Sequence, residues 1–149
     1  MKKSTIILIA IVYIASIVVI SVLGLKAKIY DEIFSVTSIE CLNETDDTAF
    51  VEEYNGKKVI NVQYIGEGNM ETLEGTMVQL VYRVLPDNAT NKKVKFIYNE
   101  TLTRIHFVKD DKGNDLGLVM FTGTGIFNIR IMATDGSQVY TDIVINVYP

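Results

Sequence analysis

Cys41 and His106 are the single cysteine and the single histidine of the chain. A thiol beside an imidazole can act as a nucleophile, because the imidazole removes the thiol proton. The two residues are far apart in the sequence, and no pattern predicts that the fold brings them together. His106 stands between Ile105 and Phe107, so strand alternation predicts an exposed histidine between two inward side chains. We expect Cys41 to pack as a small apolar residue, and one cysteine with one histidine supplies neither an internal disulfide nor a clustered zinc set.

Carboxylates are densest between Asp110 and Asp115, where the sequence reads Asp-Asp-Lys-Gly-Asn-Asp. Calcium takes oxygen ligands from loops of this kind. However, the spacing is not that of an EF-hand loop, and a lysine lies inside the run, so we interpret it as a solvated hairpin loop. Glu52 and Glu53 are a second acidic pair, in a different predicted hairpin. We therefore predict no catalytic residues, no metal site and no cofactor.

Three asparagines, Asn43, Asn88 and Asn99, begin Asn-x-Ser/Thr sequons. Such short patterns are common by chance and matter only where a glycosylation pathway exists. Asn88 also fits a turn after Pro86. We interpret all three sequons as incidental.

Exposed tyrosines are the better candidates for a binding surface, because tyrosine is enriched at protein interfaces. Alternation places Tyr82, Phe96 and Phe127 on the inward side of predicted strands. Tyr54, Tyr140 and Tyr148 fall on the opposite side. We predict these three residues as partner-binding positions.

The surroundings of these residues follow from how charge and hydropathy are distributed. The chain has 149 residues and a net charge of −4. Residues 5–25 carry no charge, whereas the rest of the chain after Lys3 carries 18 acidic and 12 basic residues, a net charge of −6. An acidic domain without a basic run is unsuited to nucleic acid, whose binding requires neutralised phosphates. The length after residue 25 suits one domain with a single core.

Residues 5–25 form the apolar segment, and as a helix they would be about 31 Å long, close to the roughly 30 Å hydrocarbon core of a bilayer. The segment is longer than the apolar part of a typical signal peptide, and its exit is a weak cleavage site, which favours an uncleaved anchor. Secretion after cleavage is the alternative. Basic residues flank both ends, and the N-terminal amine favours a cytoplasmic N-terminus. We expect a cytoplasmic tail (1–4), a transmembrane helix (5–25), a juxtamembrane segment (26–34) and an extracytoplasmic domain (35–149).

The domain is predicted to be all-β, because apolar residues alternate with polar ones in several runs. The clearest runs lie over residues 78–84, 127–133 and 139–147, with a shorter one over 94–98. Turn sequences separate them: Asn55-Gly56, Lys112-Gly113-Asn114 and Asp135-Gly136. A two-residue Asn-Gly turn would place Glu53 opposite Lys58. Short strands with frequent turns predict an antiparallel β-sandwich.

Residues 84–96 read Val-Leu-Pro-Asp-Asn-Ala-Thr-Asn-Lys-Lys-Val-Lys-Phe. With Glu74-Gly75-Thr76 before them, and Gly123-Thr124-Gly125 and Ala133–Ser137 after them, they resemble the bacterial immunoglobulin-like group 2 (Big-2) domain over residues 73–147. Residues 35–39 would then be the first strand. Phe96 stands where that family usually has tryptophan, and a hairpin over residues 50–65 is additional.

The resemblance implies an extracytoplasmic immunoglobulin-like sandwich, seen in adhesins and as a binding or spacer module of surface enzymes. We therefore expect a membrane-anchored module for binding, adhesion or scaffolding at the cell surface. Its partner would be an envelope protein or a surface polymer. The alternative is a small accessory subunit of a membrane or envelope complex, recognised through its transmembrane helix.

Overall fold

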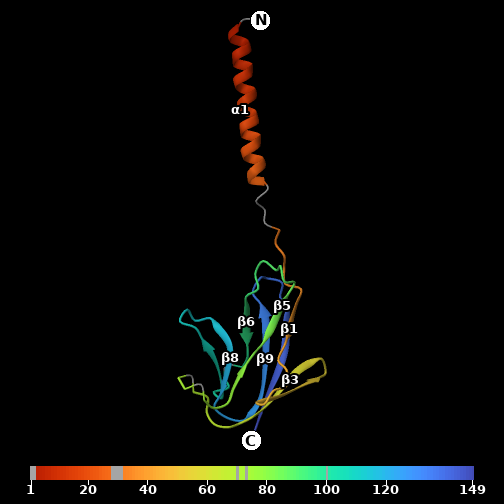
Figure 1. The fold of residues 1–149 in the computed structure, drawn as a ribbon, viewed down its shortest axis with the longest axis vertical. Coiled ribbons are helices and arrows are strands. Elements are labelled where there is room, and N and C mark those ends of the chain that lie inside the picture. Colours follow the sequence, from red (N-terminus) through yellow and green to blue (C-terminus); the bar gives the residue numbers. More distant parts are fainter. Residues whose placement is uncertain (1–2, 28–31, 70, 73, 100) are drawn as a thin grey trace. The chain divides into compact units, whose positions relative to one another are not determined.

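The computed structural model describes residues 3–27, 32–69, 71–72, 74–99 and 101–149 (Figure 1). The chain divides into two compact units, residues 1–33 and residues 34–149. The predicted tail (1–4) and juxtamembrane segment (26–34) lie partly outside the described residues.

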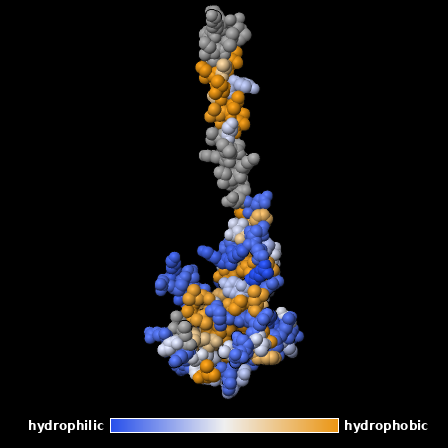
Figure 2. Space-filling view, viewed as in Figure 1, coloured by the Kyte–Doolittle hydropathy of each residue, from blue (hydrophilic) through white to orange (hydrophobic). Residues whose placement is uncertain are grey.

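The first unit contains one helix, α1 (Lys3–Ala27), as expected for an apolar run. Side chains are described for Thr5 and for residues 9–21, and all of these are exposed (Figure 2). Within this described part, no helix is both long and apolar enough to cross a membrane. The transmembrane anchor over residues 5–25 therefore stays a prediction, while its helical state is confirmed.

The second unit is all-β, as predicted, and its described residues contain no helix. Each strand is short, and a turn or loop separates it from the next. The strands are β1 (Ser38–Cys41), β2 (Ala49–Tyr54), β3 (Lys57–Gln63), β4 (Met77–Gln79), β5 (Tyr82–Leu85), β6 (Val94–Ile97), β7 (Ile105–Lys109), β8 (Asp115–Phe121), β9 (Gly125–Ala133) and β10 (Tyr140–Tyr148).

These strands form three groups around one core. The largest sheet has the order β2-β3-β10-β9-β6, a second has the order β4-β8-β7, and β1 pairs with β5. Every group contributes buried side chains to the same apolar cluster, including Ile39, Ile60, Val119, Phe127 and Ile145. Sheets that share one core are consistent with a β-sandwich, and in Figure 1 β8 lies to the left of β9.

The long hairpin β9–β10 confirms the predicted alternation. Phe127, Ile129 and Ile131 on β9 are buried, as are Ile143 and Ile145 on β10. The two strands pair antiparallel along their length. A loop containing Asp135-Gly136 connects them, as the turn signal predicted.

The hairpin β2–β3 confirms a second prediction. Its turn residues Asn55 and Gly56 both have positive φ, at 51° and 73°, as a type I′ turn requires. Glu53 lies opposite Lys58 in the observed register. The hairpin is therefore a regular part of the structure.

The pairing of this hairpin with the rest of the domain differs from the prediction. β3 lies parallel to β10, so the sandwich is not wholly antiparallel. The two strands of a hairpin run in opposite directions, and β3 is the one whose Ile60 and Val62 are buried. Because the apolar side of β3 packs against the core, β3 lies beside β10. In this position β3 runs parallel to β10.

Two predicted strands have different limits in the structure. The run over residues 78–84 is divided into β4, which pairs with β8, and β5, which pairs with β1. The first strand begins at Ser38 and not at residue 35. A side chain holds the chain just before it, because the amide of Val36 donates to Asp135 Oδ2 at 2.6 Å.

Candidate functional site

The three predicted binding tyrosines lie on the outer face of the five-stranded sheet. Tyr54 is 68% exposed, Tyr140 50% and Tyr148 43%. Tyr140 and Tyr148 lie at opposite ends of β10, about 27 Å apart at roughly 3.4 Å per residue. Tyr54 lies beside Lys57, at the end of the sheet where β10 begins. The structure therefore exposes all three tyrosines but does not gather them into one patch.

The outer face between these tyrosines is occupied by internal polar contacts. Arg130 makes two hydrogen bonds to the carboxylate of Asp142, at 2.7 and 3.0 Å. These bonds hold the pKa of Asp142 below its usual value and raise the pKa of Arg130. The Tyr140 ring covers the same guanidinium at 3.7 Å, and Lys57 Nζ lies 3.8 Å from Asp142. Two cations, Arg130 and Lys57, share the one carboxylate of Asp142, so the cluster has a net charge of +1 and its side chains are engaged with one another.

Cys41 and His106 are placed as the sequence predicted. Cys41 is buried on β1, and its thiol contacts the side-chain oxygen of Asn43 at 3.4 Å. His106 is exposed on β7, between the buried Ile105 and Phe107. A buried thiol whose contact is an asparagine has no base to activate it.

The acidic loop over residues 110–115 forms the expected hairpin turn between β7 and β8. Asp110 Oδ1 accepts from the amides of Lys112 and Asn114, each at 2.8 Å, and Asp110 Oδ2 accepts from the Asn114 side chain. The Asn114 side chain contributes most to the lowered pKa of Asp110. Asp110 thus stabilises its own loop. Across the described residues, no three Asp, Glu, His or Cys side chains are arranged to hold a metal ion.

Of the three sequon asparagines, Asn43 has a structural role that the sequence analysis missed. Its amide nitrogen donates to Gln79 O at 2.8 Å, and its oxygen accepts from Val81 N at 2.8 Å. The amide therefore bonds to the edge of the β4–β5 segment as a neighbouring strand would. No spacing rule predicts this role, because Asn43 and Gln79 are far apart in the sequence.

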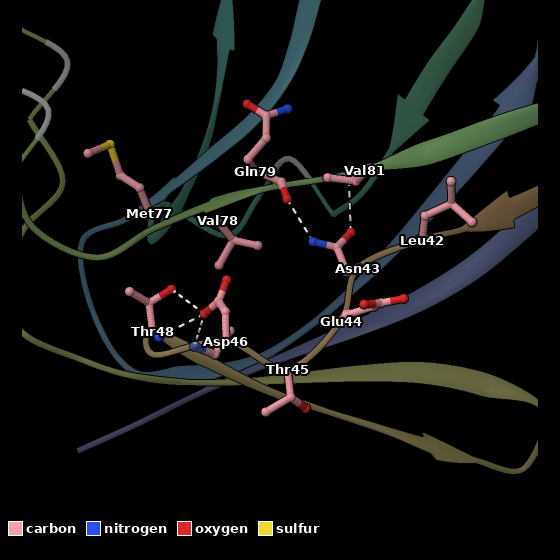
Figure 3. Close-up of a pocket in the computed structure, with 11 residues that line it drawn as sticks. Leu42, Asn43, Glu44, Thr45, Asp46, Thr48, Met77, Val78, Gln79 and Val81 are labelled. Atoms are coloured by element: carbon pink, nitrogen blue, oxygen red, sulfur yellow. Dashed lines mark hydrogen bonds between the residues drawn. The ribbon is translucent and has the colours of Figure 1, made fainter.

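A pocket of about 440 Å³ opens directly beside this asparagine (Figure 3). Its volume lies within the range of ligand-binding pockets. One wall is the segment after β1, and the other is β4 with the residues that follow it. Val78 and Asp46 face each other across it. Its lining residues are Leu42, Asn43, Glu44, Thr45, Asp46, Thr48, Ala49, Met77, Val78, Gln79 and Val81.

A second pocket of about 290 Å³ continues the first along β4. The two share Thr48 and Met77, so we treat them as one feature and call it the β4 groove. The second pocket is lined by Asp47, Thr48, Val62, Gln63, Ile65, Gly75, Thr76 and Met77.

Acidic side chains lie along one wall of the β4 groove, in the segment after β1, where Lys58 Nζ also donates to Asn43 O at 3.0 Å. Glu44, Asp46 and Asp47 are all exposed, and no lysine or arginine is among the lining residues of the described chain. Asp46 is held by the hydroxyl of Thr48 and by the amides of Thr48 and Ala49, which lower its pKa. The carboxylate of Asp46 is therefore ionised at neutral pH.

The β4 groove is lined mainly by apolar, acidic and neutral polar side chains. Its described lining contains no histidine, serine, cysteine or lysine, and Thr48 Oγ1 donates to Asp46 Oδ1 within it at 2.7 Å. No family model and no curated protein matches this chain.

Proposed function

We propose that this chain is a single-pass membrane protein whose extracytoplasmic β-domain binds a partner at the cell surface, for adhesion or scaffolding and without catalysis. The observation that carries the proposal is the β4 groove, an open acidic cleft beside a strand edge on a well-packed domain. The partner is an envelope protein or a surface polymer.

The domain is proposed to be immunoglobulin-like and of the Big-2 type. The segment that carries the resemblance forms β5, a turn and β6, and in that turn the amide of Ala89 donates to Pro86 O at 2.9 Å. Phe96 occupies the family's usual tryptophan position. It is buried, stacks on Phe107 at 5.0 Å between ring centroids and meets the edge of Tyr82 at 5.8 Å. This aromatic cluster supports a core equivalent to one built on tryptophan.

The membrane anchor rests on the sequence over residues 5–25 and on the exposed apolar side chains of α1, such as Ile11, Ile14 and Ile20. Apolar side chains of this density need an apolar solvent or a partner. We place the N-terminus in the cytoplasm, and secretion after cleavage is the alternative.

Two measurements on cells that produce the full chain test this proposal. Protease added outside intact cells should remove a C-terminal epitope tag, because the domain is outside. A photoreactive residue in place of Leu42 or Val81, beside the β4 groove, should give an adduct of defined mass. The same residue in place of Asp111, on the β7–β8 loop and outside the lining of the β4 groove, should give none. A protected epitope would refute the location, and equal labelling at all three positions would refute a localised binding site.

The accessory-subunit alternative rests on α1, whose described apolar side chains are exposed. If the helix carries recognition, scrambling the order of residues 5–25 at constant composition should abolish function while the protein stays in the membrane. If the domain carries recognition, the scrambled protein should remain active.

A further inference from the structure

We propose that the β4 groove binds an extended, basic segment of a partner protein, which pairs with β4 as an additional strand. This inference rests on the proposed binding function and specifies how the partner is recognised. It follows from the hydrogen bonding of β4, the path of the preceding segment and the charge of the rim.

The hydrogen bonds between β4 and β8 identify which edge of β4 is free. The amide of Leu80 donates to Gly117 O at 2.8 Å, and the amide of Phe121 donates to Thr76 O at 3.0 Å. Hydrogen-bonded and non-hydrogen-bonded residue pairs alternate in an antiparallel ladder. The backbone groups of Thr76, Val78 and Leu80 therefore point towards β8. The backbone groups of Met77 and Gln79 therefore point to the opposite edge, which borders the β4 groove.

Three backbone groups on this edge have no partner. Gln79 O accepts from Asn43, but within the described part of the chain no group bonds to Gln79 N, Met77 N or Met77 O. Backbone groups of a strand edge are the usual template for an added strand. At one end of this free stretch, the Asn43 side chain bonds to Gln79 O and Val81 N, each at 2.8 Å.

The segment after β1 explains why this edge stays open. The amide of Leu42 still donates to Val81 O at 2.8 Å, and the Asn43 side chain extends the pairing by one step. After Asn43 the chain turns away from β4 and forms a loop that leads into β2. In this loop Asp46 N donates to Ala49 O at 2.9 Å. The space left between this loop and β4 is the β4 groove (Figure 3).

The charge of the rim selects the class of partner. Glu44, Asp46 and Asp47 are acidic and exposed, and Lys58, whose Nζ donates to Asn43 O at 3.0 Å, offsets one of these three charges. The wall stays acidic, so a segment with lysine or arginine is favoured. A second copy of this chain, paired through the same edge, would place two acidic rims side by side. The described lining has no aromatic ring, so it lacks the stacking platform with which sugars are usually bound.

The probe is a fluorescent eight-residue peptide of alternating lysine and valine, mixed with the isotopically labelled full chain in detergent micelles. Amide hydrogen exchange of Met77 and Gln79 should be fast in the free protein and at least about tenfold slower with the peptide. Val78 is the internal control, because its amide is already directed to β8. A peptide methylated on alternate backbone nitrogens and a peptide with glutamate in place of lysine should both fail to bind.

Charge reversal on the protein supplies the matched variants. Glu44→Lys should weaken binding of the lysine peptide about tenfold, since Glu44 is exposed on the rim and has no hydrogen bond in the described structure to lose. Asp111→Lys changes the charge equally on the β7–β8 loop and should leave binding unchanged. Gln79→Pro removes one edge donor and should also weaken binding. If Gln79→Pro does not fold, the proposal is tested by the hydrogen-exchange data and by the binding of Glu44→Lys.

Three outcomes would overturn the proposal. Peptide binding without protection of Met77 and Gln79 would show another binding mode. Protection that rises with protein concentration, without peptide, would identify a second copy as the occupant. No binding of any peptide would refute a basic segment. In each case, cross-linking in cells from Leu42 or Val81 still tests the binding function, so the two failures are distinguishable.

Discussion

At the scale of single residues, Asp135 is the carboxylate of the β9–β10 loop, and it links that loop to the segment before β1. It accepts hydrogen bonds from Ser137 and from the amide of Val36, and these lower its pKa, Ser137 contributing most. A lowered pKa in the folded state means that the stabilisation is present above the unfolded pKa, about 3.9, and is lost as the pH falls through the folded value.

We therefore expect the urea midpoint of the full chain in micelles to fall as the pH decreases from about 5 towards 2. Asp135→Asn should show a lower midpoint at pH 7 and a shallower pH dependence. Asp142 also has a lowered pKa and remains in the variant, so some acid sensitivity should persist. An unchanged slope in Asp135→Asn would contradict the role given to this carboxylate.

Substitution of Ile145 and of Ile126 compares a buried isoleucine with an exposed one. Ile145 is 0% exposed on β10, and Ile126 is 67% exposed on β9. Ile145→Ala should lower the free energy of unfolding by about 2–5 kcal/mol, because it removes buried contacts and leaves a cavity. Ile126→Ala should change it by less than about 0.5 kcal/mol. Urea denaturation measures both, and similar losses would contradict the assigned burial.

At the scale of elements, two glycines with positive φ allow two causes of destabilisation to be compared. One cause is an unfavourable backbone conformation, and the other is a steric clash of an added Cβ. Gly56 has φ +73° and nothing within 4 Å of an added Cβ, so Gly56→Ala should cost about 1 kcal/mol. Gly75 has φ +89°, and a Cβ there would overlap the backbone carbonyl of Glu67. Gly75→Ala should therefore be several-fold more destabilising in the same denaturation assay. Equal costs would contradict the close approach of the 66–76 loop to itself.

The strands that could be predicted from sequence are those whose signals are local. Alternation identifies the inward residues of β9 and β10, and Asn55-Gly56 fixes the register of β2 with β3. The parallel pairing of β3 with β10 depends on which hairpin strand has the apolar face toward a distant core. The change of partner between β4 and β5 depends on where β1 ends. Neither has a signal in neighbouring residues.

The candidate site was less predictable than the fold for the same reason. Tyrosine exposure follows from alternation, and the structure agrees with it for Tyr54, Tyr140 and Tyr148. The β4 groove could not be predicted in this way, because it exists only where the segment after Asn43 leaves the edge of β4. An asparagine amide that replaces a strand looks, in sequence, like any other asparagine in a loop.

At the scale of the whole molecule, the residues of the core lie within one of the two units. The buried apolar cluster runs in sequence from Val36 to Val147, within the unit of residues 34–149. The contacts of its first residues, such as the bond from Phe34 N to Thr90 Oγ1 at 2.9 Å, are also internal to that unit. Folding of the β-domain should therefore not require α1.

We expect residues 34–149, produced without residues 1–33, to unfold in one cooperative transition at the same urea midpoint as the domain in the full chain. Circular dichroism should report strand structure, and the m-value should match, because the same surface is exposed on unfolding. Ile145→Ala should lower both midpoints equally. A clearly lower midpoint for the shortened chain would mean that residues 1–33 stabilise the domain. Equal midpoints would mean that residues 34–149 fold independently of residues 1–33, as the division of the chain into two compact units predicts.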